Sequence, residues 1–346
     1  MRGGAVLIRA DASPMLGAGH VLRCLALAGP LARRLPVVFV IAHVLPNLAA
    51  RIAAAGHTIR LLEGVEPGGR RDLAATIAIA REIGASVAVV DGAHFDEAYQ
   101  DHVRSACGRL VRVDDEAIAV GVADVIVNHG LHAVEAAYET KARPGAIRLL
   151  GPRYALVREE FRWARALEAP RTHLLIVMGG SDPAGLTDRL AELLLGADDL
   201  PPIVALVGST APGVKTLVER AARSQGRLRV CVDEPKVADI MARSTVAIAA
   251  AGGTTWELCC LGVPALLVAA SANQLPVAEA AARSGVAVNL GWHGDLTSDR
   301  LLAELRGLLR NPDRWADIAR AGRTLVDGEG PGRVARVVLE ERTWRS

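Results

Sequence analysis

Short apolar runs alternate with amphipathic or alanine-rich stretches along the whole chain. The runs at 5–9 (AVLIR) and 265–268 (ALLV) are apolar almost throughout, as is typical of strands buried on both faces of a parallel sheet. Such strands, alternating with helices, predict stacked βαβ units. We expect the strands of the first half near residues 5–9, 37–41, 58–62, 87–91, 110–114 and 124–127. We expect those of the second half near residues 173–178, 203–208, 228–231, 246–250, 265–268 and 286–290.

The chain has 346 residues, which is long for a single hydrophobic core. We therefore expect an N-terminal Rossmann-like domain over residues 1–165 and a C-terminal one over residues 172–330. The linker is expected around Pro170, because a proline stops the helix that precedes it. A last helix over 331–346 follows, and packing back toward the first domain is one arrangement for it. Two open α/β domains in tandem predict a ligand cleft at the carboxyl ends of their strands.

Charge and composition narrow the possible partners. Lys and Arg number 40 against 38 Asp and Glu, and they are interspersed, so neither nucleic acid nor a membrane surface is an expected partner. One uncharged stretch, 258–278, contains Pro264 and Pro276, which argue against a membrane span. The five cysteines lack the spacing of metal ligands, which favours a reduced cytoplasmic protein without a metal. The adjacent pair at 259–260 indicates helix packing rather than redox chemistry.

The stretch 17–23 (GAGHVLR) joins the first strand to a helix. Glycines at such a turn let a ligand approach the backbone, and a helix N-terminus offers free N–H groups to anions. His20 lies in the first turn of this helix, and a histidine titrates near neutral pH, so it is placed to move a proton beside an anionic ligand. The alternative is that the glycines only form the loop and that His20 caps the helix or packs.

The stretch 251–257 (AGGTTWE) follows the buried strand at 246–250 and precedes another helix. Paired glycines, exposed N–H groups and threonine hydroxyls together are suited to holding a diphosphate. Thr254 and Glu257 also fit a capping box, which is the structural alternative for both residues.

Two weaker motifs follow other strands of the second half. The stretch 178–183 (MGGSDP) could touch a phosphate or sugar, or it could be a strand-to-helix turn with an aspartate cap, which we favour on this motif alone. Asn273 and Gln274 could read sugar hydroxyls, or they could form a turn before Pro276, which is again favoured. The chain has no Gly-Lys-Ser/Thr motif, and its Gly-x-Gly segment lacks a third glycine, which argues against ATP and NAD.

In order and spacing, the motifs of this chain resemble one family over nearly its whole length. That family is the PseG family, the UDP-sugar hydrolases of pseudaminic acid biosynthesis, with its spore-coat polysaccharide relatives. The matching segments are 9–12 (RADA), 17–23 (GAGHVLR), 149–156 (LLGPRYAL), 179–183 (GGSDP), 252–264 (GGTTWELCCLGVP), 272–274 (ANQ) and 327–328 (DG).

The resemblance implies a GT-B architecture, with two Rossmann-like domains facing each other across a nucleotide cleft. It also implies metal-independent hydrolysis, without a cofactor, of a UDP-linked diacetamido-trideoxy sugar at its anomeric carbon, with inversion. His20 matches the general base of the family. The diphosphate loop matches Gly252, Gly253, Thr254 and Thr255, the ribose contact matches Glu257, and the sugar-contacting segment matches Asn273 and Gln274.

Further candidates lie in the same motifs. Gly19, Gly180 and Ser181 are candidate diphosphate contacts, and Arg9 is a candidate sugar contact. Asp11 is a candidate to orient His20 or the attacking water, and its alternative is a loop carboxylate that caps the turn.

The chain departs from the family at two places. The tyrosine that usually follows the strand end at Asp91 is missing, because the chain reads Gly92-Ala93-His94 there, and an Asn-Gln pair is replaced by Asn128-His129. Both differences bear on which sugar is bound. A GT-B glycosyltransferase that uses a UDP-sugar donor, and a nucleotide-sugar-binding protein without turnover, are the alternative functions.

Overall fold

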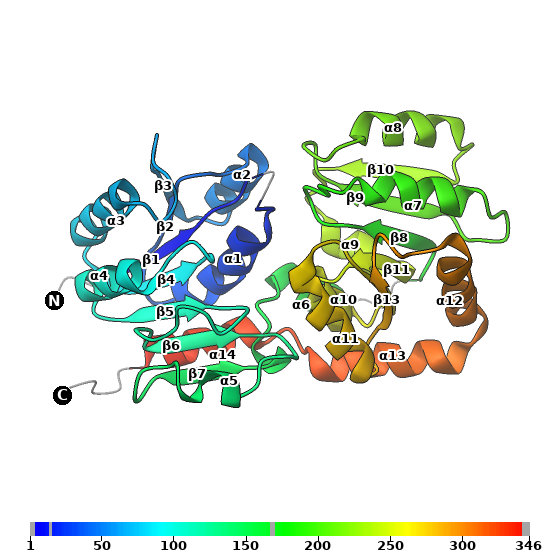
Figure 1. The fold of residues 1–346 in the computed structure, drawn as a ribbon. Helices are drawn as coiled ribbons and strands as arrows, with labels where there is room; N and C mark the ends of the chain where they lie inside the picture. The colour runs from blue at the N-terminus through cyan, green and yellow to red at the C-terminus, as the bar shows by residue number, and fades with distance from the viewer. Residues whose placement is uncertain (1–3, 14–15, 167–169, 341–346) are drawn as a thin grey trace. The chain divides into compact units, whose positions relative to one another are not determined.

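The computed structural model describes residues 4–13, 16–166 and 170–340, and these divide into two units. The first unit runs to Arg158 and resumes at Glu329, and the second comprises Glu159–Gly328 (Figure 1). Each unit has a parallel sheet with helices on both faces.

The sheet of the first unit has seven strands in the order β3-β2-β1-β4-β5-β6-β7, all paired in parallel. The strands are β1 (Ala5–Ala10), β2 (Val37–Ile41), β3 (Thr58–Leu61), β4 (Ala85–Asp91), β5 (Leu110–Val113), β6 (Val125–Asn128) and β7 (Ile147–Leu150). The helices are α1 (Gly19–Ala32), α2 (Pro46–Ala54), α3 (Arg70–Glu82), α4 (Glu97–Cys107), α5 (Ala136–Glu139) and α14 (Gly330–Leu339), with a 3-10 turn at Pro152–Tyr154.

Two hydrophobic cores cover the faces of this sheet. One contains α1, α2 and α14, and the other contains α3 and α4. Val334, Ala335 and Val338 of α14 are buried in the same core as α1, so this helix completes the first unit. Residues 341–346 of the expected last helix lie outside the described residues.

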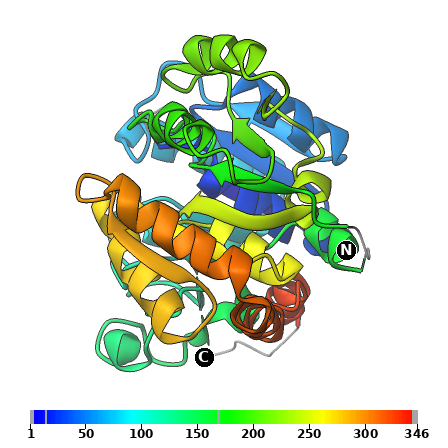
Figure 2. The same ribbon diagram turned by 90° about the vertical axis from the view of Figure 1, so that its right-hand side faces the viewer.

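The sheet of the second unit has six parallel strands in the order β10-β9-β8-β11-β12-β13. The strands are β8 (His173–Val177), β9 (Ile203–Val207), β10 (Leu228–Val232), β11 (Ser244–Ala250), β12 (Ala265–Ala269) and β13 (Val288–Trp292). The helices are α6 (Glu159–Arg165), α7 (Leu186–Leu195), α8 (Val214–Arg223), α9 (Val237–Ala242), α10 (Thr254–Leu261), α11 (Leu275–Arg283), α12 (Ser298–Arg310) and α13 (Pro312–Leu325), with a 3-10 turn at Ala272–Gln274. Helices α7, α8 and α12 share one core with the sheet, and Figure 2 shows α7 and α12 in front of it.

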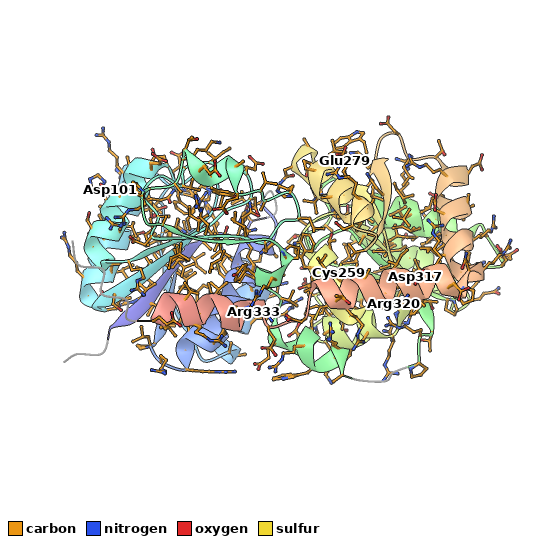
Figure 3. The ribbon with its side chains drawn as sticks, turned by 90° about the horizontal axis from the view of Figure 1, so that it is seen from below. Asp101, Cys259, Glu279, Asp317, Arg320 and Arg333 are labelled. Atoms are coloured by element: carbon orange, nitrogen blue, oxygen red, sulfur yellow. The ribbon has the colours of Figure 1, made fainter. Side chains whose placement is uncertain are left out.

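Helix α10 is buried between the sheet and α13. A Cβ on Gly322 of α13 would lie 3.1 Å from the Cα of Cys259, so glycine lets the two helices approach closely (Figure 3). Cys259 and Cys260 are buried here, and burial raises the pKa of their thiols to about 12 and about 11. Both thiols therefore stay protonated and act as small apolar groups.

The chain divides earlier than the expected boundary at residue 165. Helix α6 belongs to the second unit because Phe161 and Ala164 are buried and Arg165 donates to the carbonyls of Cys260 and Val326. Part of the expected linker, 167–169, lies outside the described residues.

Two strands differ from the sequence-based expectation. Strand β7 was not expected, because it is a short, half-buried edge strand interrupted by Arg148. The last strand, expected at 286–290, is shifted to Val288–Trp292. The uncharged stretch at 258–278 is divided among α10, β12 and α11, and none of the described helices is long and apolar enough to cross a membrane.

Candidate functional site

Strand order singles out one place in each sheet. The chain reverses its direction of travel across the sheet between β1 and β4 in the first unit, and between β8 and β11 in the second. Open parallel sheets bind ligands outside the carboxyl ends of the strands at such a switch point. The segment 17–23 follows β1, while 179–183 follows β8 and 252–257 follows β11. Three of the four stretches singled out from the sequence therefore start at a switch point, and the fourth, 273–274, follows the neighbouring strand β12.

His20 lies in the first turn of α1, after the exposed Gly19. Its Nδ1 is 2.7 Å from Oδ1 of Asp91, the last residue of β4. The Asp91 side chain is fully buried, whereas that of His20 is 26% exposed. The carboxylate fixes the proton on Nδ1, which leaves the Nε2 lone pair as the basic site of the ring. His20 is thus oriented to accept a proton.

Asp91 is in turn held by Arg23, one turn further along α1. Arg23 Nε is 2.6 Å from Oδ2 of Asp91, and its Nη2 is 2.6 Å from Oδ1. Burial opposes ionisation of Asp91, but Arg23 and His20 outweigh it and hold the pKa of this carboxyl well below its usual range. Arg23 also forks onto Asp115, with Nη1 at 2.7 Å from Oδ1 and Nη2 at 2.9 Å from Oδ2.

Asp11 does not contact His20 in the manner expected from the sequence. Its carboxylate is fully buried, and Oδ1 accepts from the backbone N–H groups of Ala42 at 2.7 Å and His43 at 3.1 Å. Asp11 thus ties the β1 and β2 loops together, as in the loop-carboxylate alternative. Asp91 takes the orienting position instead, and no local motif indicates this contact, because the two residues are 71 positions apart.

Arg9 is also placed differently from the expectation. Its side chain is fully buried, and it donates to both oxygens of Asp72, at 3.0 and 2.6 Å. Its Nη1 is 2.8 Å from Oδ2 of Asp11. A guanidinium enclosed in this way does not reach a bound sugar, so the predicted sugar contact by Arg9 is wrong for this structure. Arg9 instead neutralises the two buried carboxylates beside it.

A second histidine lies at the same switch point. His94 follows β4, its Nε2 is 3.3 Å from Oδ2 of Asp11, and its ring packs on Phe95 with centroids 4.1 Å apart. The His94 side chain is 25% exposed. The sequence identified this position only as a departure from the family pattern. In the structure, Asp11 and Phe95 contact the His94 ring, and the rest of the ring is partly exposed.

In the second unit, the turn after β11 presents backbone rather than charge. Helix α10 begins at Thr254, and its N-cap is Gly253, which has no side chain to cover the first N–H groups. A Cβ on Gly253 would meet nothing within 4 Å, so space is open at this helix N-terminus. Within the described residues the buried Thr255 Oγ1 has no hydrogen-bond partner. Glu257 lies half-buried in the first turn of the same helix.

Of the amide pair after β12, Gln274 lies beside this turn. Its Oε1 accepts from the N–H of Ala270 at 2.9 Å, and its Nε2 is 3.8 Å from the place of a Cβ on Gly252. Asn273 is turned into its own loop, where its Oδ1 accepts from Ser271 Oγ at 2.6 Å.

The turn after β8 is closed by its own aspartate. Asp182 accepts from the N–H of Leu186 at 3.0 Å and from that of Thr187 at 2.8 Å, which satisfies the start of α7. The capping interpretation therefore describes this helix. Gly180 and Ser181 precede the cap, with Gly180 exposed and Ser181 half-buried.

No protein-family model matches the chain. Over 199 residues it is 28% identical to the spore coat polysaccharide biosynthesis protein SpsG of Bacillus subtilis, covering 55% of this chain and 57% of the relative. Over 210 residues it is 33% identical to the UDP-N-acetylglucosamine–N-acetylmuramyl-(pentapeptide) pyrophosphoryl-undecaprenol N-acetylglucosamine transferase of Sorangium cellulosum, covering 57% and 50%. The chain thus spans about half the length of the curated relatives it matches.

Solved structures resemble the whole chain in fold. MurG of Acinetobacter baumannii superposes with a TM-score of 0.64 at 16% identity, covering 96% of this chain and 99% of that one. The UDP-GlcNAc 2-epimerase of Neisseria meningitidis bound to UDP-GlcNAc superposes with a TM-score of 0.68 at 10% identity, covering 97% and 99%. The chain has the GT-B fold, with two parallel-sheet α/β domains.

Proposed function

We propose that this chain is a UDP-sugar-dependent glycosyl-transfer enzyme of polysaccharide biosynthesis. His20 would remove the proton of the attacking hydroxyl, and α10 would receive the diphosphate that leaves. The observation that carries the proposal is the 2.7 Å contact between His20 Nδ1 and the buried Asp91, which would orient His20 as a base at a switch point. The proposal is also supported by the names of two relatives of this chain, which are a polysaccharide biosynthesis protein and an N-acetylglucosamine transferase.

The proposed reaction is a single displacement at the anomeric carbon. A new bond forms between the acceptor oxygen and this carbon, while the bond from the carbon to the β-phosphate oxygen breaks. The acceptor proton goes to His20 Nε2, and the electron pair leaves with UDP, so the configuration inverts. The N–H groups before α10 would stabilise the charge that develops on the diphosphate, together with Thr254 and Thr255.

The other predicted contacts would bind the ribose, the diphosphate or the sugar under this proposal. Glu257 would bind the ribose hydroxyls, and Gln274 would contact the sugar or the phosphate beside Gly252. Gly19, Gly180 and Ser181 would lie along the diphosphate, and Asn273 would reach the sugar only after releasing Ser271.

Hydrolysis is the second candidate, with water as the acceptor and a UDP-linked diacetamido-trideoxyhexose as the substrate. Two considerations support it. The motifs resemble those of the pseudaminic acid hydrolases, and the ring of His20 is partly exposed, so it could activate a water instead of a sugar hydroxyl. The relative named as an N-acetylglucosamine transferase favours transfer.

The deciding experiment is acceptor-free turnover. The purified chain is incubated with UDP-GlcNAc and with a panel of UDP-diacetamido sugars, and free UDP and free sugar are followed by NMR. Release of UDP with an inverted free sugar indicates hydrolysis, and UDP release only after addition of an acceptor indicates transfer. UDP binding without release under either condition would overturn catalysis, and the absence of UDP binding would overturn the whole proposal.

The matched variant is His20→Ala. A general base typically contributes about 10²–10⁴-fold to the rate, so turnover should fall by that factor while UDP affinity stays unchanged. Turnover close to that of the wild type would remove His20 from the mechanism.

A further inference from the structure

His20 lies at one end of a row of four side chains in which basic side chains alternate with carboxylates. Asp91 lies next to His20, Arg23 lies next to Asp91, and Asp115 lies beyond Arg23. Arg23 occupies both oxygens of Asp91, and its Nη2 shares Oδ1 with His20. The same Nη2 is 3.1 Å from His20 Nδ1. The Arg23 side chain is 14% exposed and that of Asp91 is fully buried, so water screens this pair weakly, whereas the Asp115 side chain is 46% exposed.

The two neighbours act on the imidazole in opposite directions. A buried carboxylate beside a histidine favours the imidazolium form, which cannot accept a proton. A guanidinium at 3.1 Å disfavours the same form because it repels a second positive charge. A histidine that serves as a base needs the carboxylate for orientation but must not be held protonated by it.

We infer that Arg23 is a positioning residue that keeps His20 in its proton-accepting state while holding the Asp91 carboxylate in line with Nδ1. Asp115 fixes the guanidinium from the other side and moderates its charge. This inference rests on the proposed role of His20 as the base. It assigns Arg23 and Asp115, which neither the sequence motifs nor the comparisons assign.

Of the other ionisable groups around the row, Arg112 carries a charge that also acts on Asp91 and Asp115, and the rest are neutral or bound elsewhere. Burial raises the pKa of the Cys24 thiol, which lies 3.5 Å from Asp91 Oδ2, so this group stays neutral. Burial lowers the pKa of His129 to about 4, so this ring is neutral at pH 7. Arg112 on β5 is the other nearby cation, and it donates to the carbonyl of Gly92 at 2.8 Å. Asp114 is bound by Tyr138, and His94 is bound by Asp11.

The test compares pH–rate profiles of Arg23→Gln and Asp115→Asn with the wild type. In Arg23→Gln the unopposed Asp91 should protonate His20 more readily, so the acidic limb should move upward by about one pH unit or more. On the acidic limb itself, activity at a given pH then falls about tenfold, and it recovers at alkaline pH. In Asp115→Asn the less compensated Arg23 should move the acidic limb toward lower pH. Shifts of the acidic limb in opposite directions in these two variants would indicate that the charges of Arg23 and Asp115 control the protonation of His20.

One further variant separates charge from geometry, and two exposed substitutions serve as controls. Arg23→Lys keeps the charge but loses the fork, so its acidic limb should stay in place while the plateau of the rate falls. Arg34→Gln and Asp101→Asn, both exposed, are the controls and should leave the profile unchanged. Asp101 is labelled on the outer side of the first unit in Figure 3.

A direct readout keeps the inference separate from the proposed function. The imidazole C–H signal of His20, assigned by its loss in His20→Gln, is followed by NMR against pH in each variant. A shifted titration in a protein without turnover would uphold the charge tuning and overturn the proposed function. An unchanged titration in Arg23→Gln, or a loss of rate that is equal at every pH, would overturn the inference. If Arg23→Gln does not fold, Asp115→Asn alone decides by the direction of its shift.

Discussion

The carboxyl edges of the two sheets have the same topology at their switch points and opposite chemistry. At the edge of the first sheet, four aspartates and two arginines form buried or half-buried ion pairs, two histidines are hydrogen-bonded to two of these aspartates, and Asp91 and Arg9 have no exposed side-chain surface. At the edge of the second sheet, the turn before α10 offers glycines, threonine hydroxyls and the amide of Gln274.

The difference shows how one architecture divides two tasks. Moving a proton requires ionisable groups whose protonation is set by neighbours, and burial makes those neighbours effective. Holding an anion requires hydrogen-bond donors without a nearby negative charge that would repel it, and backbone N–H groups meet this requirement. Fold alone does not distinguish the two edges, whereas the side chains after each strand do.

Lowering the pH should produce the largest difference in stability between the two units. Arg23 outweighs burial and lowers the pKa of Asp115 to about 2, and ion pairs likewise hold the pKa values of Asp11, Asp72 and Asp91 below their usual range. Because the folded values lie below the unfolded value of about 3.9, the stabilisation is full above about pH 5 and is lost as pH falls toward 2. Hydrogen exchange should show the first unit opening before the second. Simultaneous loss of protection in both units would contradict this.

Asp91→Asn should have the largest effect among single substitutions. It removes one partner of a buried pair and leaves Arg23 with Asp115 as its remaining counter-charge, and breaking a buried pair typically costs about 3–5 kcal/mol. Native-state hydrogen exchange of the β4 amides measures this cost. Exchange in β11 serves as the internal control and should not change.

Gly253→Ala should weaken UDP binding without weakening the fold. The open space around this residue accepts a methyl group, so the free energy of unfolding should change by less than about 0.5 kcal/mol. The methyl group would occupy space that a phosphate needs, and we expect the Kd for UDP to rise roughly tenfold, or about 1.4 kcal/mol. Calorimetry measures the Kd. Gly332→Ala, at an equally open site in the first unit, should bind UDP as the wild type does.

Asp182→Ala distinguishes the two turns of the second unit. It removes the cap of α7 and should cost about 1 kcal/mol of stability, measured by urea denaturation. UDP affinity should stay close to that of the wild type, because α7 is closed by this aspartate rather than open to a ligand. A large loss of UDP affinity would show that Gly180 and Ser181, the proposed diphosphate contacts in this turn, depend on Asp182 for their position.

His94→Gln should have the smallest effect and only on substrate. We expect the exposed part of the His94 ring to make one hydrogen bond to the sugar. Losing that bond, worth about 0.5–1.5 kcal/mol, would raise KM for the UDP-sugar roughly twofold to tenfold and leave the Kd for UDP unchanged. Steady-state kinetics across the sugar panel measures the change. His102→Gln, at an exposed position on α4, is the control.

Local patterns were sufficient for much of the fold. Strands such as β1 and β8 are buried throughout and apolar at every position but one, and the sequence pattern predicts them because both faces of a parallel sheet are covered. Strand β7 has only one buried residue in four, so hydrophobicity alone did not reveal it.

The candidate site was predictable only as far as single motifs reach. His20 and the turn before α10 follow from glycines and hydroxyls next to strand ends. The contacts among Asp91, Arg23 and Asp115 depend on β4 lying beside β1 and on β5 lying beside β4, and the contact of Arg23 with Asp115 spans 92 positions. Arg9 was misjudged for the same reason, because its partner Asp72 is 63 positions away. Long-range pairing, rather than any local signal, decides which charges are buried.

The return of α14 to the first unit has a consequence for biosynthesis. The second unit is continuous in sequence, whereas the first lacks Val334, Ala335 and Val338 of its core until the segment after residue 328 has left the ribosome. The nascent chain can therefore complete the second unit while α1 still exposes the apolar face that α14 covers. Translation that stops short of α14 would release a polypeptide with this face open to chaperones and proteases.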